Sequence, residues 1–179
     1  ITTIDLDHQA FLGNDRESIG FEKAGIMRQN QQVVIGDKQA PKSVLKHATQ
    51  LNTQLNMRDR DFHLNQESNS PFWHCTIHGT SFFQFPPAHI PQDNIVTAMM
   101  VINILSIDIS NEEFVSLINT TKVAGRTEII EGHCQTLLDV GHNPLAARYL
   151  AEKIPTFSAR KIHAVVGMLA DKDISNTLQ

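Results

Sequence analysis

Lys23 lies where the sequence predicts the apolar face of a short helix. Asn14 or Asp15 can cap a helix that begins near Arg16 and runs towards Gly25, because a short side-chain oxygen accepts from the unpaired amides of the first turn. At 3.6 residues per turn, the lysine shares one stripe with three apolar residues. These are Ile19, Ile26 and Met27. Lysine is rarely buried without a partner, so its place in this stripe needs an explanation.

Three explanations of Lys23 are open. The side chain can extend along the stripe and place its ammonium in water, or it can pair with Asp15, Glu17 or Glu22. Alternatively, the amine can react with carbon dioxide, and the anionic oxygens of the resulting carbamate can hold a hard cation such as Mg²⁺. His8, just past the first predicted strand, could share that cation, although imidazole is an uncommon Mg²⁺ ligand.

The turn LLDVGHNPLAA, residues 137–147, is a second place that could do chemistry. Asn143 followed by Pro144 is a cap and first-turn pair, which predicts that a helix begins there. Asp139, Gly141 and His142 then lie beyond the carboxyl end of a strand and beside a helix N-terminus, where phosphates bind in open α/β sheets. Asp139 and His142 could equally serve only to hydrogen-bond the turn.

Two further residues are candidates at the starts of elements. Asn94 begins a long predicted helix, residues 92–107, in a position that suits either a helix cap or a ligand contact. Arg126 follows Gly125 at a predicted hinge, where it could clamp an anion or remain solvated or ion-paired. Neither residue indicates a function without further support.

Strands and helices alternate along the first part of the chain, which predicts an α/β layer. Strand patterns at residues 1–6 and 31–36 flank the lysine helix, and a helical register follows from Pro41. Residues 73–85 predict a hairpin around His78-Gly79-Thr80. A helix is expected from about Asn111, with Ser110 as its cap.

The remainder of the chain predicts a second domain. A strand at residues 134–140, a helix at 143–154 and a strand at 161–169 form one βαβ unit, the start of a doubly wound domain. We therefore divide the chain into residues 1–124, a hinge at 125–131, and residues 132–179.

Length, charge and cysteine usage narrow the functional classes. The 179 residues suit one ordinary domain or two small ones, and a net charge of −4 without a basic stripe argues against a nucleic-acid surface. The longest nearly apolar run, residues 95–107, is too short to span a bilayer. Cys75 and Cys134 lack metal-type or CxxC spacing, which fits the reduced cytoplasm. Both ends of the sequence read as cuts inside a larger fold, so we expect a fragment.

The segment DHQAFLGNDRESIGFEKAGIMR closely resembles the signature of folylpolyglutamate synthases, especially the bacterial enzymes that are also dihydrofolate synthases. GRTEII, LLDVGHNPLAARYLA and VVGMLADKDI resemble later signatures of that family, in the same order. The resemblance covers most of the chain outside residues 38–87. It implies the remnant of a P-loop-type Mur ligase central domain, followed by the start of a Rossmann-like C-terminal ligase domain.

The activity implied by this resemblance is ATP-dependent amide ligation. Such enzymes convert a substrate carboxylate to an acyl phosphate, which the amine of L-glutamate then attacks; dihydropteroate and (tetrahydro)folate are the implied acceptors. Mg²⁺ is the implied metal, with a monovalent cation such as K⁺ as a second candidate. A cytoplasmic monomer is implied, with neither nucleic acid nor membrane as a partner.

The resemblance also assigns roles to individual residues. The family's histidine metal ligand falls on His8, and its carbamylated lysine, which is both a metal ligand and catalytic, falls on Lys23. The nucleotide-contacting positions fall on Asn94, Arg126 and Asp139. The motif histidine falls on a further catalytic candidate, His142.

Three departures from the family pattern stand out. Asp93 occupies the place of a proline in the family's PQPNAATA-like segment, and Gly141 that of an alanine. No GTNGKGS-type phosphate loop occurs in the sequence, so we expect this chain alone to be inactive. Two alternatives stay open: a Mur-type peptidoglycan amino-acid ligase, and a non-catalytic remnant that binds folate or nucleotide.

Overall fold

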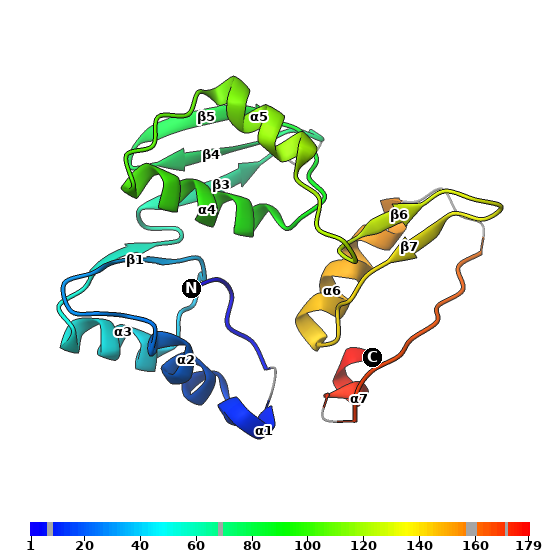
Figure 1. Ribbon diagram of the computed structural model, residues 1–179, viewed down its shortest axis with the longest axis horizontal. Helices are drawn as coiled ribbons and strands as arrows, with labels where there is room; N and C mark the ends of the chain where they lie inside the picture. The colour runs from blue at the N-terminus through cyan, green and yellow to red at the C-terminus, as the bar shows by residue number, and fades with distance from the viewer. Residues whose placement is uncertain (7–8, 68–69, 157–160, 171) are drawn as a thin grey trace.

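The computed structural model describes residues 1–6, 9–67, 70–156, 161–170 and 172–179. A short helix α1 (Gln9–Leu12) precedes a first layer, in which the strands β1 (Gln32–Ile35) and β2 (Gln54–Met57) pair in parallel. The helices α2 (Arg16–Ala24) and α3 (Lys42–Gln50) pack together beside this pair (Figure 1). The predicted α/β class is therefore confirmed.

The strand β1 is apolar because both of its faces are buried. Val33 and Ile35 face a core shared with α2 and α3, whereas Val34 faces the core around α4 (Gln92–Ile104). The predicted first strand is not a regular strand, yet Ile1 pairs with β1 in parallel fashion. Its amino group donates to the Val34 carbonyl at 2.8 Å, and its carbonyl accepts from the Gly36 amide at 2.8 Å.

The middle unit is an antiparallel sheet of β3 (Phe62–Gln66), β4 (Trp73–Ile77) and β5 (Thr80–Phe85). Alternate residues of β4 are buried, as expected for a sheet with one face in the core. His78 and Gly79 both have positive φ, +47° and +82°, which confirms the predicted hairpin turn. The helix α4 contacts β1 on one side and β3 on the other, so it joins the first layer to this unit.

Two helices pack against the antiparallel sheet, α4 and α5 (Asn111–Thr120). The predicted cap of α5 is confirmed, because Ser110 and Glu113 form a reciprocal capping box. The helix predicted over residues 92–107 ends earlier, at Ile104. Ser106 adopts a left-handed φ of +53°, which stops the helical ladder.

The C-terminal layer contains β6 (Glu128–Ile130) and β7 (Thr136–Leu138), an antiparallel pair, followed by α6 (Pro144–Lys153) and a 3₁₀ turn (Ile154–Thr156). The predicted helix start is confirmed, since the Asn143 side chain accepts from the Ala146 amide at 2.9 Å. The last element is the short helix α7 (Ile174–Thr177). Figure 1 shows this layer beside the first layer and the middle unit.

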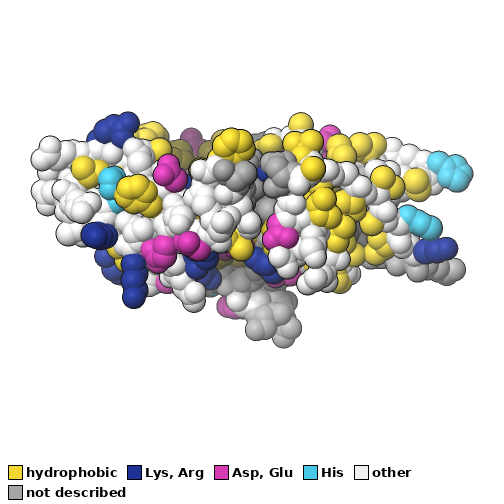
Figure 2. Space-filling model, turned by 90° about the horizontal axis from the view of Figure 1, so that it is seen from below, with side chains coloured by type: hydrophobic (Ala, Val, Ile, Leu, Met, Phe, Trp, Pro, Cys, Tyr) yellow, Lys and Arg dark blue, Asp and Glu magenta, His cyan; other side chains and the backbone are white. Residues whose placement is uncertain are grey.

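The second strand of the predicted βαβ unit is not formed. Residues 161–169 include no assigned strand, and Val165 is fully exposed, at 100%. An apolar segment becomes a strand only where a neighbour completes its backbone hydrogen bonds, and no described segment pairs with these residues. Apolar side chains accordingly gather on the surface at this end of the molecule (Figure 2). The predicted domain limits and the P-loop ancestry of the first layer stay predictions.

The lengths of the helices bear on membrane insertion. None of the helices formed by them is both long and apolar enough to span a bilayer.

Candidate functional site

The amino end of α4 lies over the carboxyl ends of β1 and β2. A Cβ on Gly36, just after β1, would be 2.3 Å from Thr97 Oγ1, so the strand and the helix approach as closely as a glycine permits. Arg58, just after β2, pairs with Asp93 in the first turn of the helix. Ligands of open α/β sheets bind at this edge.

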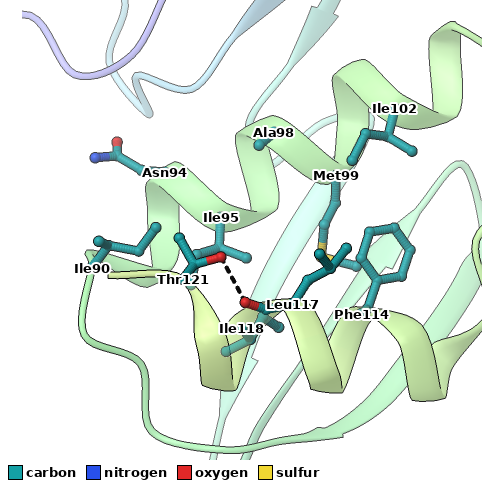
Figure 3. Close-up of a pocket in the computed structure, with 10 residues that line it drawn as sticks. All are labelled: Ile90, Asn94, Ile95, Ala98, Met99, Ile102, Phe114, Leu117, Ile118 and Thr121. Atoms are coloured by element: carbon teal, nitrogen blue, oxygen red, sulfur yellow. Dashed lines mark hydrogen bonds between the residues drawn. The ribbon is translucent and has the colours of Figure 1, made fainter. Parts of the chain in front are cut away.

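Asn94 is exposed in the first turn of α4 and is not its cap. Pro91 holds the cap position, and no side chain accepts from the first amides of the helix. The cap interpretation of Asn94 is therefore wrong. Figure 3 shows its carboxamide directed away from the apolar side chains around it. Within the described residues nothing hydrogen-bonds that carboxamide, so it can meet a ligand.

An apolar groove of about 210 Å³ lies between α4 and α5, with Asn94 at its edge (Figure 3). Its walls include Ile95, Met99, Phe114 and Ile118. The groove presents no charged group, so it does not suit a phosphate.

Asp139 is nearly buried and ties the hinge to the β7–α6 turn. Its Oδ2 accepts from the Thr127 amide at 2.8 Å, and its Oδ1 accepts from the Gly141 amide at 2.6 Å. The Arg126 Nη1 lies 3.9 Å from the same Oδ1, and 9% of the aspartate side chain is exposed against 47% of the arginine. Both oxygens of Asp139 therefore hold backbone, whereas the Arg126 guanidinium faces solvent.

Thr127 connects this cluster to the loop before α4. Its hydroxyl donates to the His89 carbonyl at 2.5 Å. Close by, the Val140 amide donates to the Gly125 carbonyl at 2.7 Å. The structure thus gathers Arg126, Asp139 and the segment leading to Asn94 around one junction. The sequence analysis did not single out Thr127, although this residue lies in the GRTEII segment directly after the predicted hinge arginine.

His142 lies in the turn before α6, half-buried. Its Nδ1 is 2.9 Å from the Val140 carbonyl; because a carbonyl only accepts, Nδ1 carries the proton of this contact and Nε2 is the acceptor of the neutral ring. Gly141 allows the turn to pack tightly, since a Cβ there would be 2.7 Å from that of Ala146. The glycine that departs from the family pattern is therefore accommodated by close packing.

Lys23 is exposed, which corrects the prediction that it lies on a buried face. The buried face of α2 is formed by Ile19, Gly20 and Ala24, and Ile26 is 65% exposed. Gly20 sets this orientation, because a Cβ there would lie 2.9 Å from the Pro41 ring. The helix consequently turns its small residues, not the lysine, towards α3.

Two of the acids expected to pair with Lys23 are engaged elsewhere. Asp15 caps α2 by accepting from the Ser18 amide at 2.8 Å, and this bond lowers the pKa of the carboxyl group. Glu17 accepts from the amides of Ser43 and Lys42 at 2.7 and 2.9 Å, which lowers its pKa in the same way. Among the described residues no acid pairs with Lys23, and its side chain is exposed.

His8 lies outside the described residues, so its predicted partnership with Lys23 stays a prediction. The segment leading to it is nevertheless well held. Asp37, which is 3% exposed and follows β1, accepts from the Ile4 amide at 2.7 Å and pairs with Arg16 at 3.0 Å. Across the layers, Asp5 Oδ2 lies 2.5 Å from the Arg148 Nη2 of α6. The described residues contain no cluster of three acidic, cysteine or histidine side chains suited to a metal.

Comparisons with known proteins agree on one family. Residues 125–178 match the family described as Mur ligase, glutamate ligase domain. The dihydrofolate synthase/folylpolyglutamate synthase of Haemophilus influenzae is 35% identical over 100% of this chain and 45% of its own length. The protein of the same name from Escherichia coli K12 is 33% identical over 99% of this chain and 42% of its own length.

Solved structures agree with these sequence matches. E. coli FolC in complex with DHPP and ADP has a TM-score of 0.89 at 31% identity, over 99% of this chain and 42% of that one. A bifunctional folylpolyglutamate synthase/dihydrofolate synthase with Mn, AMPPNP and L-glutamate bound also has a TM-score of 0.89, at 37% identity, over 99% of this chain and 43% of that one. The chain spans less than half the length of these relatives. It belongs to the dihydrofolate synthase/folylpolyglutamate synthase family of Mur ligases.

Proposed function

We propose that this chain forms part of an ATP-dependent ligase that adds L-glutamate to dihydropteroate or a (tetrahydro)folate through an acyl phosphate. The observation that carries the proposal is that almost the whole of this chain matches dihydrofolate synthase/folylpolyglutamate synthases, at 33–35% identity. Relatives of known structure hold ADP with DHPP, or AMPPNP with Mn and L-glutamate. The same ligand classes are therefore proposed for this protein.

The residues at the junction of the layers would position the nucleotide. Asn94 offers an exposed carboxamide in the first turn of α4, and Arg126 offers a solvent-facing guanidinium at the hinge. A guanidinium suits phosphate oxygens because its donors form a planar fork. Asp139 would orient this junction through the Thr127 and Gly141 amides. Positioning matters most in phosphoryl transfer, where the protein contributes geometry and charge neutralisation.

His142 would act from the turn before α6. Its Nδ1 donates to the Val140 carbonyl, so a proton would be taken up at Nε2, which is buried in this structure and would have to become exposed for the step. The attacking amine of L-glutamate must lose a proton as the amide forms, so an acceptor near the acyl phosphate favours the reaction.

Lys23 and His8 would hold the divalent cation, Mg²⁺ in the proposed enzyme, with K⁺ as a candidate for a second site. An ammonium repels a cation, so Lys23 fits this role only as a carbamate. Its exposure leaves the amine accessible to carbon dioxide. When bound, the cation neutralises phosphate charge.

A phosphate loop is also required, and the sequence contains no GTNGKGS-type motif. Without the amides and lysine of such a loop, the β- and γ-phosphates lack their main cradle. We therefore propose that residues 1–179 alone do not turn over ATP. The complete ligase is proposed to be a cytoplasmic monomer that requires neither nucleic acid nor membrane.

The test is an ADP-release assay on the product of the complete reading frame. We expect release to require L-glutamate together with dihydropteroate or a reduced folate, and residues 1–179 alone to release none. A muramyl peptide serves as the competing acceptor. Release of ADP with the muramyl peptide and not with a pteroate or folate would remove the folate assignment.

A further inference from the structure

A buried arginine reaches the first turn of α4 from the end of β2. The Arg58 side chain is 1% exposed, and its amide continues the parallel ladder by donating to the Ile35 carbonyl at 2.9 Å. Its Nε and Nη2 donate to one oxygen of Asp93 at 3.1 and 2.9 Å. Its Nη1 donates to Asp59 in the same turn. Two carboxylates thus enclose a guanidinium that has almost no access to water.

Apart from this ion pair, few side-chain contacts hold the first turn of α4. No side-chain cap is present, because Pro91 occupies the cap position. Asp93 lies in the first turn, where a negative charge is stabilised by the helix dipole. The Thr97 hydroxyl donates to the Asp93 carbonyl at 2.7 Å, and Thr97 is itself packed against Gly36. Asp93 therefore links the first turn of α4 to the ends of β1 and β2, through Arg58 and Thr97.

Asn94 is adjacent to Asp93 and is exposed. A carboxamide recognises a base or ribose only if its backbone is held still, because a displacement of about 1 Å weakens a hydrogen bond severely. Proline, which the resembling motif carries at position 93, would restrain the turn through its fixed φ. The ion pair with Arg58 restrains the same turn by a different means.

We propose that the Arg58–Asp93 pair is a positioning device that holds Asn94 for the nucleotide. This role rests on the proposed function. Removal of the Asp93 carboxylate leaves the buried guanidinium with Asp59 alone, so Arg58 would move towards solvent and release the turn. Nucleotide affinity then falls while the chemistry at the acyl phosphate is unaffected.

The experiment compares Asp93→Ala with the unaltered complete ligase. We expect the Kd for AMPPNP and the KM for ATP to rise about tenfold, with kcat at saturating ATP and the KM for L-glutamate unchanged. Arg60→Ala is the matched control. Arg60 lies in the same turn and pairs with Asp61 instead of Asp93, so we expect no change in AMPPNP affinity.

A second variant separates positioning from folding. Arg58→Met with Asp93→Pro replaces the ion pair by an apolar side chain and a stiff backbone, and we expect AMPPNP affinity within about threefold of the unaltered ligase. An unchanged Kd in Asp93→Ala, or a tenfold weaker Kd in a folded double variant, overturns the role of the pair. If the unaltered ligase itself does not bind AMPPNP, the proposed function fails, and this role fails with it.

Discussion

The hinge and the end of α2 differ in whether their charged side chains have hydrogen-bond partners among the described residues. At the hinge, both oxygens of Asp139 accept from backbone amides, and Thr127 continues the network to the loop before α4. At the end of α2, Lys23 is exposed and the described residues offer it no acid. A closed network acts by holding shape, whereas an exposed side chain contributes little to the fold and is available for chemistry. The two regions should therefore respond differently to substitution.

Lys23→Ala should produce the largest effect, and on activity alone. We expect the complete ligase to lose about 100-fold in kcat/KM, because the proposed carbamate ligand of the cation cannot form. The thermal midpoint should stay the same, since the side chain is exposed. A short carboxylate added to the buffer should restore part of the rate.

Lys46→Ala is the control for this prediction, because Lys46 is also exposed and lies on α3. Full activity of the Lys23 variant would mean that the lysine is only a solvated surface residue. The end of α2 would then have no catalytic role to compare with the structural role of the hinge.

Asp139→Asn should affect both stability and activity. The amide can accept at only one of its two positions, so one of the Thr127 and Gly141 amides loses its partner, at a cost of about 1–2 kcal/mol. We expect faster hydrogen exchange at the Thr127 amide and about a tenfold lower rate. Glu131→Gln, a change on the exposed surface, should have neither effect. Unchanged exchange at Thr127 would show that the network is not closed as described.

Glu17→Ala tests whether the acids near Lys23 belong to the fold. Glu17 accepts from the first amides of α3, so its loss should lower the thermal midpoint by about 3 °C at pH 7. Glu22→Ala on the same helix is the control. Because the amides of Ser43 and Lys42 lower the folded pKa of Glu17 below its ordinary value of 4.5, its contribution is complete above that pH.

The same contribution should disappear as the pH falls through the lowered folded pKa. The thermal midpoints of the unaltered protein and of Glu17→Ala should therefore converge in acid. A difference that persists at pH 2 would assign the effect to packing and not to the charged cap.

The smallest effect is expected at the cysteines. Burial raises the pKa of the Cys75 thiol to about 12, whereas Cys134 is exposed in the C-terminal layer. A thiol reagent at pH 8 should label Cys134 and leave Cys75 unreacted in the native protein, because the thiolate is the reactive form. Cys134→Ser should abolish labelling without altering activity. Rapid labelling of Cys75 would indicate that the middle unit opens.

Features that depend on neighbouring residues were predicted most reliably from the sequence. Caps at Asp15, Ser110 and Asn143 and the turn at His78-Gly79 could be predicted because each depends on a few neighbouring residues. The class of fold followed from the alternation of strands and helices. The position of Asp139 beyond a strand was also correct.

Errors arose where distant residues decide the outcome. The burial of Lys23 was predicted from periodicity. In the structure, however, the close approach of Gly20 to Pro41 turns another face of α2, which includes Ala24, towards the core and leaves Lys23 exposed. Residues 161–169 have the composition of a strand and lack a partner among the described segments. The joining roles of Arg58, Asp37 and Thr127 depend on contacts between separate elements, which no single stretch of sequence reveals.

Thr127 has one consequence for motion. Its amide is bound by Asp139 within the C-terminal layer at 2.8 Å, and its hydroxyl by the loop before α4 at 2.5 Å. A hydrogen bond weakens steeply once it stretches by about 1 Å. A large rotation of the C-terminal layer about Gly125 would therefore have to break the bond to the His89 carbonyl, together with the contact between Asp5 and Arg148.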